Sequence, residues 1–279
     1  MTVGALALAI GAVGPTAASA AHRTQTHAGA SSPSSASSPS GEAMPTGNPT
    51  GWKQTFADEF TGPLGEEWSE YWGQPGSDPG GWWDPSHVSV SGGELRLATY
   101  VDPLTCIASW GCESIDGYVS GGVQLKEPQT YGKYEVRLRA DNGQGVPIVA
   151  LLWPSDGEWP PEVDFVEDTG ASPRATNVAT LHYGTLGTAS FGQASDSLSV
   201  NMSEWHTLGV EWTSGKLAYT IDGRVWATMT GANVPHQPMN LALQSQTWDC
   251  GGEWETCPGA ATPKEVSYDV DWVAIYTPA

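Results

Sequence analysis

Residues 158–168 read Glu158-Trp159-Pro160-Pro161-Glu162-Val163-Asp164-Phe165-Val166-Glu167-Asp168, a stretch that mixes five acids with apolar side chains. In an extended strand, Glu162 and Asp164 point to one face of a sheet and the apolar residues between them to the other. Strict alternation would direct Glu167 away from these two carboxylates. A single β-bulge at Phe165-Val166 restores the phase, because two residues then oppose one residue of the neighbouring strand. We therefore predict a bulged strand with Glu162, Asp164 and Glu167 on one face.

Three carboxylates on one face are suited to acid–base chemistry. At about 3.3 Å of rise per residue, the bulge leaves the backbones of Glu162 and Glu167 roughly 13 Å apart, and their side chains can lean together across Asp164. A carboxyl separation of about 5 to 5.5 Å suits cleavage of a glycosidic bond with retention of configuration. Three neighbouring acids cannot all ionise cheaply, so we expect at least one to keep its proton near neutral pH. The alternative interpretation is an acidic, solvent-facing strand.

The sequence around this stretch predicts an all-β protein. Apolar residues recur with period two at Val88 and Val90, Leu95 and Leu97, Tyr134, Val136 and Leu138, His206, Leu208, Val210 and Trp212, and Val270, Trp272 and Ala274. Asp222-Gly223 between two apolar runs is typical of a type I′ hairpin turn. No stretch keeps a helical period beyond two turns. We predict a two-sheet antiparallel β-sandwich of the jelly-roll, concanavalin-like type.

The first fifty residues predict export and a linker. Residues 3–13 form an apolar run too short to span a bilayer, and Ala18-Ser19-Ala20 offers a small-residue cleavage site. We expect residues 1–20 to be a signal peptide, the protein to be secreted, and no membrane association after cleavage; a retained anchor is the alternative. Residues 21–50, rich in Ser, Pro and Ala, are expected to be a disordered linker. Residues 51–279 are then one folded domain.

Charge restricts the classes of ligand. The chain has 31 acidic and 11 basic side chains, and all but Glu42 and Arg23 lie in residues 51–279. Such a surface disfavours nucleic acid. It would also repel sulfated or uronic-acid polymers, so a neutral polysaccharide is the expected partner. Oligomeric state leaves no signal in the sequence.

Cysteine and tryptophan patterns add two expectations. Close spacing favours the pairs Cys106–Cys112 and Cys250–Cys257 in an oxidising compartment, although three connectivities are possible and a metal site is the alternative. Several of the fourteen tryptophans lie in Gly-, Pro- and Asp-rich segments, among them Trp82, Trp159 and Trp248. Flat aromatic faces can stack on sugar rings, so these three are candidates for substrate binding, with core or rim packing as the alternative.

The chain resembles glycoside hydrolase family 16. Its bulged branch, which includes the laminarinases, has the signature Glu-aliphatic-Asp-apolar-apolar-Glu, and residues 162–167 match each defined position. Further matches follow in family order: Phe56-Ala57-Asp58-Glu59-Phe60, Tyr131-Gly132-Lys133-Tyr134-Glu135-Val136-Arg137, Leu152-Trp153-Pro154, His182-Tyr183-Gly184, Val210-Glu211-Trp212, Asp222-Gly223 and Asp271-Trp272-Val273.

The resemblance implies roles for individual residues. Glu162 would be the nucleophile, Glu167 the acid and then the base, and Asp164 the residue that orients and tunes the nucleophile. Trp153, Glu135 and His182 would line an open, concave substrate cleft near the reacting sugar. The alternatives are a cross-strand ion pair within the group Glu135, Arg137, Lys133 and Arg139, and a structural role for His182.

The resemblance also implies a possible structural calcium on the convex side, although the reaction requires no cofactor. Its positions here would be the backbone of Glu59 and Gly93 and the side chain of Asp271, and oxygen ligands suit that ion.

The implied function is an endo-acting, retaining O-glycosyl hydrolase for β-linkages of a neutral polysaccharide such as a β-1,3-type glucan. Pro161, Tyr183 and Gln244-Ser245-Gln246 depart from the family pattern, so subsites can differ. Two alternatives are a transglycosylase or wall-remodelling enzyme with the same intermediate, and a lectin-like carbohydrate-binding module without turnover.

Overall fold

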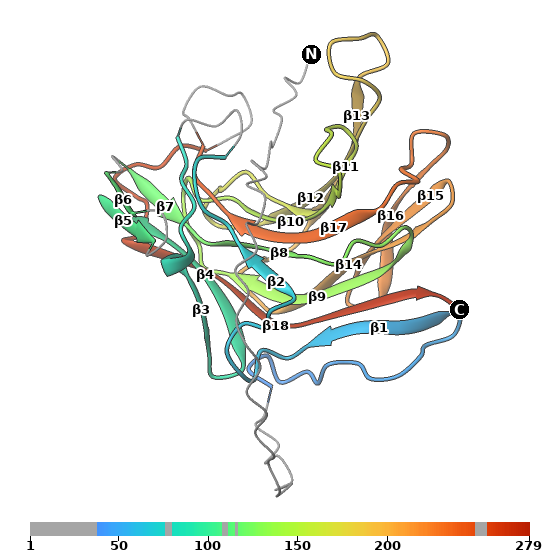
Figure 1. Cartoon of the computed structure of the whole chain (residues 1–279), viewed down its shortest axis with the longest axis horizontal. Helices are drawn as coiled ribbons and strands as arrows, with labels where there is room; N and C mark the ends of the chain where they lie inside the picture. The colour runs from blue at the N-terminus through green and yellow to red at the C-terminus, as the bar shows by residue number, and fades with distance from the viewer. Residues whose placement is uncertain (1–37, 76–79, 108–110, 115–116, 249–255) are drawn as a thin grey trace, which may run out of the picture.

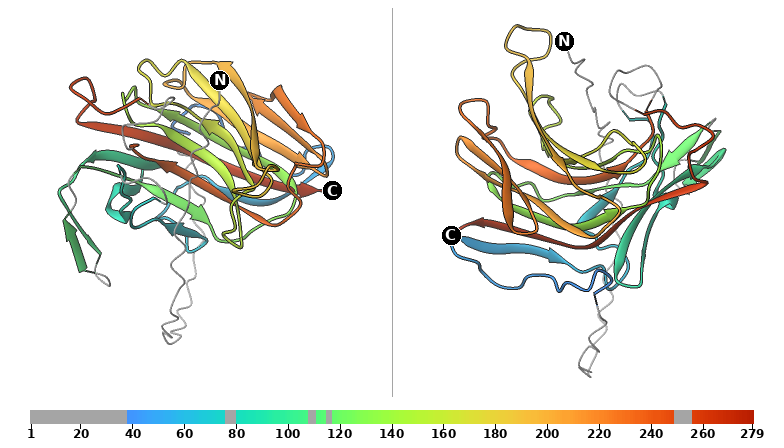
Figure 2. Two further views of the ribbon diagram at one scale, coloured as in Figure 1. Left: turned by 90° about the horizontal axis from the view of Figure 1, so that it is seen from above. Right: turned by 180° about the vertical axis from the view of Figure 1, so that it is seen from behind.

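Two stacked β-sheets form the body of the protein. The computed structural model describes residues 38–75, 80–107, 111–114, 117–248 and 256–279. Nine strands form one sheet, seven form the other, and β5 (Leu104–Ile107) with β6 (Gly111–Ser114) forms a separate hairpin. Figure 1 and Figure 2 show the two sheets stacked face to face and curved in the same sense. The predicted antiparallel sandwich is confirmed.

The nine-stranded sheet has the order β16-β15-β14-β9-β18-β4-β3, with β1 added to β18 and β7 added to β4. Its strands are β1 (Trp52–Asp58), β3 (Val88–Ser91), β4 (Glu94–Val101), β7 (Tyr118–Ser120), β9 (Gly132–Ala140), β14 (His206–Thr213), β15 (Lys216–Ile221), β16 (Arg224–Thr230) and β18 (Glu265–Pro278). A short 3-10 helix, η1 (Pro85–His87), precedes β3.

The seven-stranded sheet has the order β13-β12-β11-β10-β17-β8-β2. Its strands are β2 (Trp68–Glu70), β8 (Gly122–Leu125), β10 (Ile148–Pro154), β11 (Glu162–Glu167), β12 (Thr176–Tyr183), β13 (Gly192–Ser199) and β17 (Met239–Ser245). We call its side turned away from the other sheet the concave face, and the outer side of the nine-stranded sheet the convex face.

The main core lies between the sheets, as the period-two pattern requires. Tyr134, Val136 and Leu138 of β9 are at most 2% exposed and pack in one cluster with Val163 and Phe165 of β11. Alternate side chains of each strand therefore fill the interior, and the others are free for the two outer faces.

Asp222-Gly223 forms the predicted hairpin turn between β15 and β16. Ile221 pairs with Arg224, and the φ angles of the two turn residues are 47° and 74°. Both residues tolerate this left-handed backbone, which is the reason for the strength of the sequence signal.

The expected alternation of Val270, Trp272 and Ala274 in β18 is wrong. The register of β18 against β9 shifts between Val270 and Trp272, so Asp271 is an extra residue. Val270 and Val273 therefore face the main core, whereas Trp272 and Ala274 lie with Tyr276 in a separate cluster on the convex face. A bulge reverses the facing of every residue that follows it.

Residues 38–50 differ from the predicted disordered linker. We call them the N-terminal strap, because they pack on the convex face below β1 and β18 (Figure 1). Glu42 forms an ion pair with Arg137 at 3.1 Å, and its backbone oxygen accepts from Trp272 Nε1. Met44 packs against the Trp272 cluster. Composition predicted disorder here because the strap offers little apolar surface; the sheet supplies that surface instead.

The described residues cover only part of the segments for which a signal peptide, a linker and disulfides were predicted. The signal peptide and residues 21–37 lie outside the described residues, as does Cys250. In the β5–β6 hairpin, Cys106 is the cross-strand partner of Cys112. Both disulfides stay predictions. No helix within the described ranges is long and apolar enough to cross a membrane.

Candidate active site

The predicted bulge in β11 is confirmed by its pairing with β10. Glu167 lies opposite Val149, and the register shifts so that Asp164 lies opposite Leu151. Phe165 and the residue after it are both fully buried in the main core. Glu162, Asp164 and Glu167 therefore share the concave face, while the apolar side chains of the same strand point between the sheets.

The three carboxylates have an apolar surrounding. Glu162 and Asp164 are each 2% exposed, and Glu167 is half-buried. Their cross-strand neighbours Val149 and Leu151 are 1% and 0% exposed. Burial against apolar side chains penalises the charged form of a carboxyl group.

Neutral groups, and not cations, contact these acids. Trp159 Nε1 donates to Glu162 Oε2 at 2.7 Å, and Thr180 Oγ1 donates to Glu167 Oε2 at 2.9 Å. Asp164 and Glu162 also share a side-chain hydrogen bond. Across the described part of the chain, no Lys or Arg forms an ion pair with any of the three; the basic side chain beside Asp164 is that of His182.

These surroundings shift the protonation of all three groups. Burial raises the pKa of Glu162, and the charge of Glu167 adds to this, although the hydrogen bond from Trp159 opposes it. Burial and the neighbouring Glu162 raise the pKa of Asp164 well above its ordinary value. Burial also raises the pKa of Glu167, against the hydrogen bond from Thr180. The site can therefore hold protons near neutral pH, as the sequence predicted.

His182 lies beside the acids on β12. It is the cross-strand partner of Glu162, and its Nε2 is 3.6 Å from Asp164 Oδ2. Burial lowers the pKa of His182 to about 4, so the ring is neutral at neutral pH. Ligand atoms of Glu162, Asp164 and His182 lie within 4.8 Å of one another, close enough for a metal ion. Because Glu162 already hydrogen-bonds Trp159 and Asp164, the arrangement favours proton sharing.

The predicted substrate tryptophans fall into two groups. Trp153 and Trp248 are 3% and 4% exposed and belong to a concave-face cluster that also contains Val149 and Leu151, with Trp159 packed against it. Trp82 lies outside this cluster and meets Trp72 edge to face, with ring centroids 5.3 Å apart. The cluster forms part of the floor beside the carboxylates, so packing accounts for much of the burial of Trp153 and Trp248.

Glu135 is not in the site, and its prediction as a substrate residue is wrong. It belongs to β9 of the other sheet, where its neighbours Tyr134 and Val136 face the core. Alternation therefore directs Glu135 to the convex face, where it pairs with Lys133 at 3.0 Å. This is the ion-pair alternative that the sequence left open.

The residues expected to hold calcium do not fit that ion. Asp271 Oδ2 accepts hydrogen bonds from Ser38 Oγ and from the backbone N–H of Ser40. Pro39 lies over Gly93, 3.6 Å from the position of an added Cβ. Two donors of the strap thus bind Oδ2 of the carboxylate that would have to coordinate the ion. The strap lies where calcium was expected.

A buried ion pair behind the site was not predicted. Arg174 is 1% exposed and pairs with Asp168, which directly follows Glu167. Asp168 Oδ1 also accepts from the N–H groups of Ile148 and Gly170. This network holds the end of β11. Five residues of loop separate Asp168 from Arg174, so no local pattern could reveal the pair.

Thr180 is the second functional residue that the sequence did not single out. It lies two positions before His182 on β12, and period-two alternation puts both on the concave face. The spacing Thr-x-His was therefore an available signal, but only the pairing of β11 with β12 shows that Thr180 reaches Glu167.

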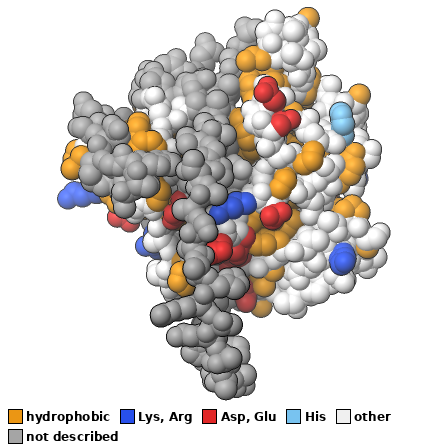
Figure 3. All heavy atoms as spheres, viewed as in Figure 1, with side chains coloured by type: hydrophobic (Ala, Val, Ile, Leu, Met, Phe, Trp, Pro, Cys, Tyr) orange, Lys and Arg blue, Asp and Glu red, His pale blue; other side chains and the backbone are white. Residues whose placement is uncertain are grey.

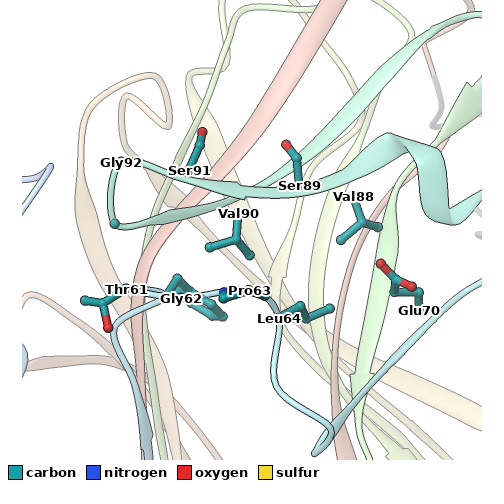
Figure 4. Close-up of a pocket in the computed structure, with 12 residues that line it drawn as sticks. Thr61, Gly62, Pro63, Leu64, Glu70, Val88, Ser89, Val90, Ser91 and Gly92 are labelled. Atoms are coloured by element: carbon teal, nitrogen blue, oxygen red, sulfur yellow. The ribbon is translucent and has the colours of Figure 1, made fainter.

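A surface cavity lies away from the carboxylates. It is lined by the segment 61–64, by Glu70 and by β3 with the turn that follows it (Figure 4). Val88, Val90 and Leu64 line it with apolar surface, and burial with the charge of Asp84 raises the pKa of Glu70. It contains Gly93 but none of the predicted catalytic or substrate residues.

Comparison with known proteins agrees with this geometry. The endo-1,3-1,4-beta-glycanase EglC of Rhizobium meliloti (strain 1021) is 30% identical over 254 residues, covering 78% of this chain and 52% of that protein. The chain thus spans about half the length of the curated relatives it matches first. The endo-beta-1,3-glucanase from Pyrococcus furiosus has the same fold, with a TM-score of 0.67 at 20% identity over 82% of this chain and 95% of that one.

The laminarinase catalytic domain from Thermotoga maritima MSB8 is equally similar in fold, with a TM-score of 0.67, 19% identity and coverage of 82% and 99%. The sequence profile described as "Glycosyl hydrolases family 16" matches residues 80–274, which include β11 and its three acids. The chain therefore belongs to glycosyl hydrolases family 16.

Proposed function

We propose that the protein is an endo-acting glycoside hydrolase that cleaves β-linkages of a neutral polysaccharide with retention of configuration. The observation that carries the proposal is the bulge of β11, which gathers Glu162, Asp164 and Glu167 on the concave face. A double displacement needs one ionised carboxylate as the nucleophile and one protonated carboxyl as the acid. Membership of the family supports the same class of reaction.

In the first step, ionised Glu162 attacks the anomeric carbon while protonated Glu167 gives its proton to the leaving oxygen. This forms a covalent glycosyl–enzyme ester and releases one end of the polymer. In the second step, ionised Glu167 takes a proton from water, whose oxygen attacks the anomeric carbon and breaks its bond to Glu162, so that the carboxylate of Glu162 leaves. Asp164, hydrogen-bonded to Glu162, orients the nucleophile.

The substrate class rests on charge and on the relatives. Lys and Arg side chains are sparse and scattered on the described part of the face in Figure 3, which disfavours an anionic polymer. The names of the relatives EglC and the Pyrococcus furiosus enzyme refer to 1,3-1,4-β-glycan and β-1,3-glucan. We therefore propose a β-1,3-type glucan as the substrate, cut internally. The predicted signal peptide supports export of the protein.

The test is a panel of β-1,3-glucan, mixed-linkage glucan, galactan and agarose, scored by product size and by the anomeric configuration of the first product in NMR. We expect β products of intermediate length from a glucan. Inverted products, or the release of single sugars from chain ends, would overturn the mechanism or the endo action. Products longer than the substrate would instead indicate that a sugar hydroxyl resolves the intermediate, as in a transglycosylase.

The carboxylate roles are tested by chemical rescue with an activated aryl glycoside. Glu162→Ala should lose turnover and recover it with azide as the inverted glycosyl azide, because azide attacks from the vacated side. Glu167→Ala should give the retained glycosyl azide from the covalent intermediate. Substantial turnover by Glu162→Gln without azide would refute the assignment of the nucleophile.

A further inference from the structure

Each of the two outer carboxylates has its own hydrogen-bond donor, and the donors differ in kind. Glu162 accepts from the indole N–H of Trp159. The ring of Trp159 is held by His182 and by Phe191, with centroid distances of 5.6 and 5.4 Å. An indole N–H can donate but cannot accept. Trp159 therefore stabilises the ionised form of Glu162 more than its protonated form, whose carbonyl oxygen is a weaker acceptor.

Glu167 accepts from a hydroxyl group, which can also accept. Thr180 Oγ1 donates to Glu167 Oε2 and receives a hydrogen bond from Ser195 Oγ at 3.3 Å. Rotation of the hydroxyl lets Thr180 donate to ionised Glu167 or accept the proton of its neutral form. This partner suits a group that loses and regains a proton in every catalytic cycle.

Burial and neighbouring acids raise the pKa of both carboxyls, and a side-chain hydrogen bond with Asp164 lowers that of Glu162. Asp164 lies between them on β11, β10 presents only apolar side chains next to them, and β12 presents neutral His182. The remaining titratable groups that interact with the three acids are Tyr71, Tyr219 and, at the end of β11, Asp168. These groups are acids or phenols, so hydrogen-bond donors are the elements that can favour charge on one carboxylate over the other.

We propose that Trp159 and Thr180 are positioning residues that divide the roles: a fixed donor favours the ionised, nucleophilic form of Glu162, and a reversible partner lets Glu167 alternate between acid and base. The inference rests on the proposed function and deepens it. It also changes the role of Trp159, which the sequence assigned to sugar stacking.

The test is the pH dependence of kcat/KM for three variants of the whole protein. Trp159→Phe keeps the ring and removes the N–H, so the pKa of Glu162 should rise and the acidic limb should move up by on the order of one pH unit. Thr180→Val removes the hydroxyl at nearly constant shape, so the alkaline limb, set by Glu167, should move up. Thr180→Ser should return that limb to its original position.

Controls separate this inference from the proposed function. Trp153→Phe alters the same aromatic cluster without removing a donor to the acids, and both limbs should stay in place whatever happens to KM. If both substitutions lower kcat equally at every pH with unmoved limbs, the division of roles is wrong although Glu162→Gln and Glu167→Gln stay inactive. If those two glutamine variants are active, the proposed function itself fails. Thermal unfolding of each variant verifies that it is folded.

Discussion

Asp164 on the concave face and Asp269 on the convex face are equally buried, with 2% of each exposed, yet their neighbours are opposite. Asp269 accepts from Arg96 Nε at 2.9 Å and from Arg139 Nε at 3.2 Å. Asp164 lies between two other acids, and burial with the charge of Glu162 raises its pKa. An acid buried beside cations ties strands together, whereas an acid buried beside acids keeps a proton available for chemistry.

The difference indicates where stability and activity are separated. On the convex face, charges are paired and the N-terminal strap covers the apolar cluster of Trp272. On the concave face, Glu162, Asp164 and Glu167 lack such pairs within the described residues and are held by neutral donors. Burying three acids without cations lowers the stability of the fold, but it also provides the shifted pKa values that acid–base catalysis needs.

A cation introduced on the concave face would remove the difference between the two faces, because the acids there would then also be paired. Val149 is the cross-strand partner of Glu167 and is 1% exposed. In Val149→Lys the ammonium group should pair with Glu167 and lower its pKa, so the acid would lose its proton. We expect kcat/KM for polysaccharide to fall by about 10² to 10⁴, with a smaller loss for an aryl glycoside whose leaving group needs no proton.

Val149→Met is the matched control, because it adds length without charge. Equal losses in the Lys and Met variants would mean that crowding and not charge is responsible. The folded state of both is verified by their thermal unfolding.

Asp168 tests how much a buried acid that is paired with a cation contributes to stability. Arg174→Met keeps the volume of the side chain but leaves Asp168 as a buried acid without its cation. Breaking a buried pair in this way costs about 3 to 5 kcal/mol of unfolding free energy, which denaturant titration would measure. The double variant Asp168→Asn with Arg174→Met should recover part of the loss; no recovery would show that the guanidinium acts through its backbone contacts to Asp141 and Val146 instead.

For an acid that is buried without a cation, such as Glu162, we predict that the unfolding free energy depends on pH. Because the pKa of folded Glu162 lies above its ordinary value of 4.5, the folded state binds more protons than the unfolded state above about pH 4.5. The unfolding free energy should therefore fall as the pH rises through the raised pKa. Glu162→Gln should gain at least about 1 kcal/mol on wild type between pH 5 and 9; a constant difference in urea titrations would contradict the raised pKa.

Substitutions in the N-terminal strap should change the stability of the convex face by a smaller amount. Glu42 is half exposed in its pair with Arg137, so Glu42→Ala should cost less than about 1 kcal/mol and should fade at high salt. Met44→Ala, which removes apolar contact with the Trp272 cluster, is the comparison variant and should be insensitive to salt. Salt sensitivity in both would mean that the strap is held by charge alone.

The smallest expected effect is that of calcium. Since Ser38 and Ser40 donate to Asp271, neither added Ca²⁺ nor a chelator should change the midpoint of thermal unfolding. A clear rise with Ca²⁺ would show that the strap gives way to the ion.

Much of the site could be predicted because its logic is local. The bulge of β11 followed from the spacing of Glu162, Asp164 and Glu167 among apolar residues, and β10 confirms it. The same reasoning failed for β18, where Asp271 is an extra residue in a run that reads as regular alternation. The three acids of β11 reveal which face they occupy because a carboxylate is excluded from the main core. Trp272 and Ala274 do not, because an apolar side chain can be buried on either face of this sheet.

Contacts between distant segments account for the other differences. Glu135 was placed with the acids by resemblance, but its strand belongs to the second sheet. The strap meets Asp271 across more than 230 residues of sequence. Composition cannot show that a Ser- and Pro-rich segment will find an apolar stripe to cover, because the stripe is created by the fold.

The sequence by itself determined the strands, the Asp222-Gly223 turn and the face shared by the three carboxylates, since period-two alternation and turn chemistry act between neighbours in the chain. Only the tertiary structure decided which partner each buried acid received: Trp159 and Thr180 on the concave face, arginines for Asp168 and Asp269. These partners are set by the pairing of strands, and through burial and hydrogen bonding they decide whether an acid holds a proton or a charge.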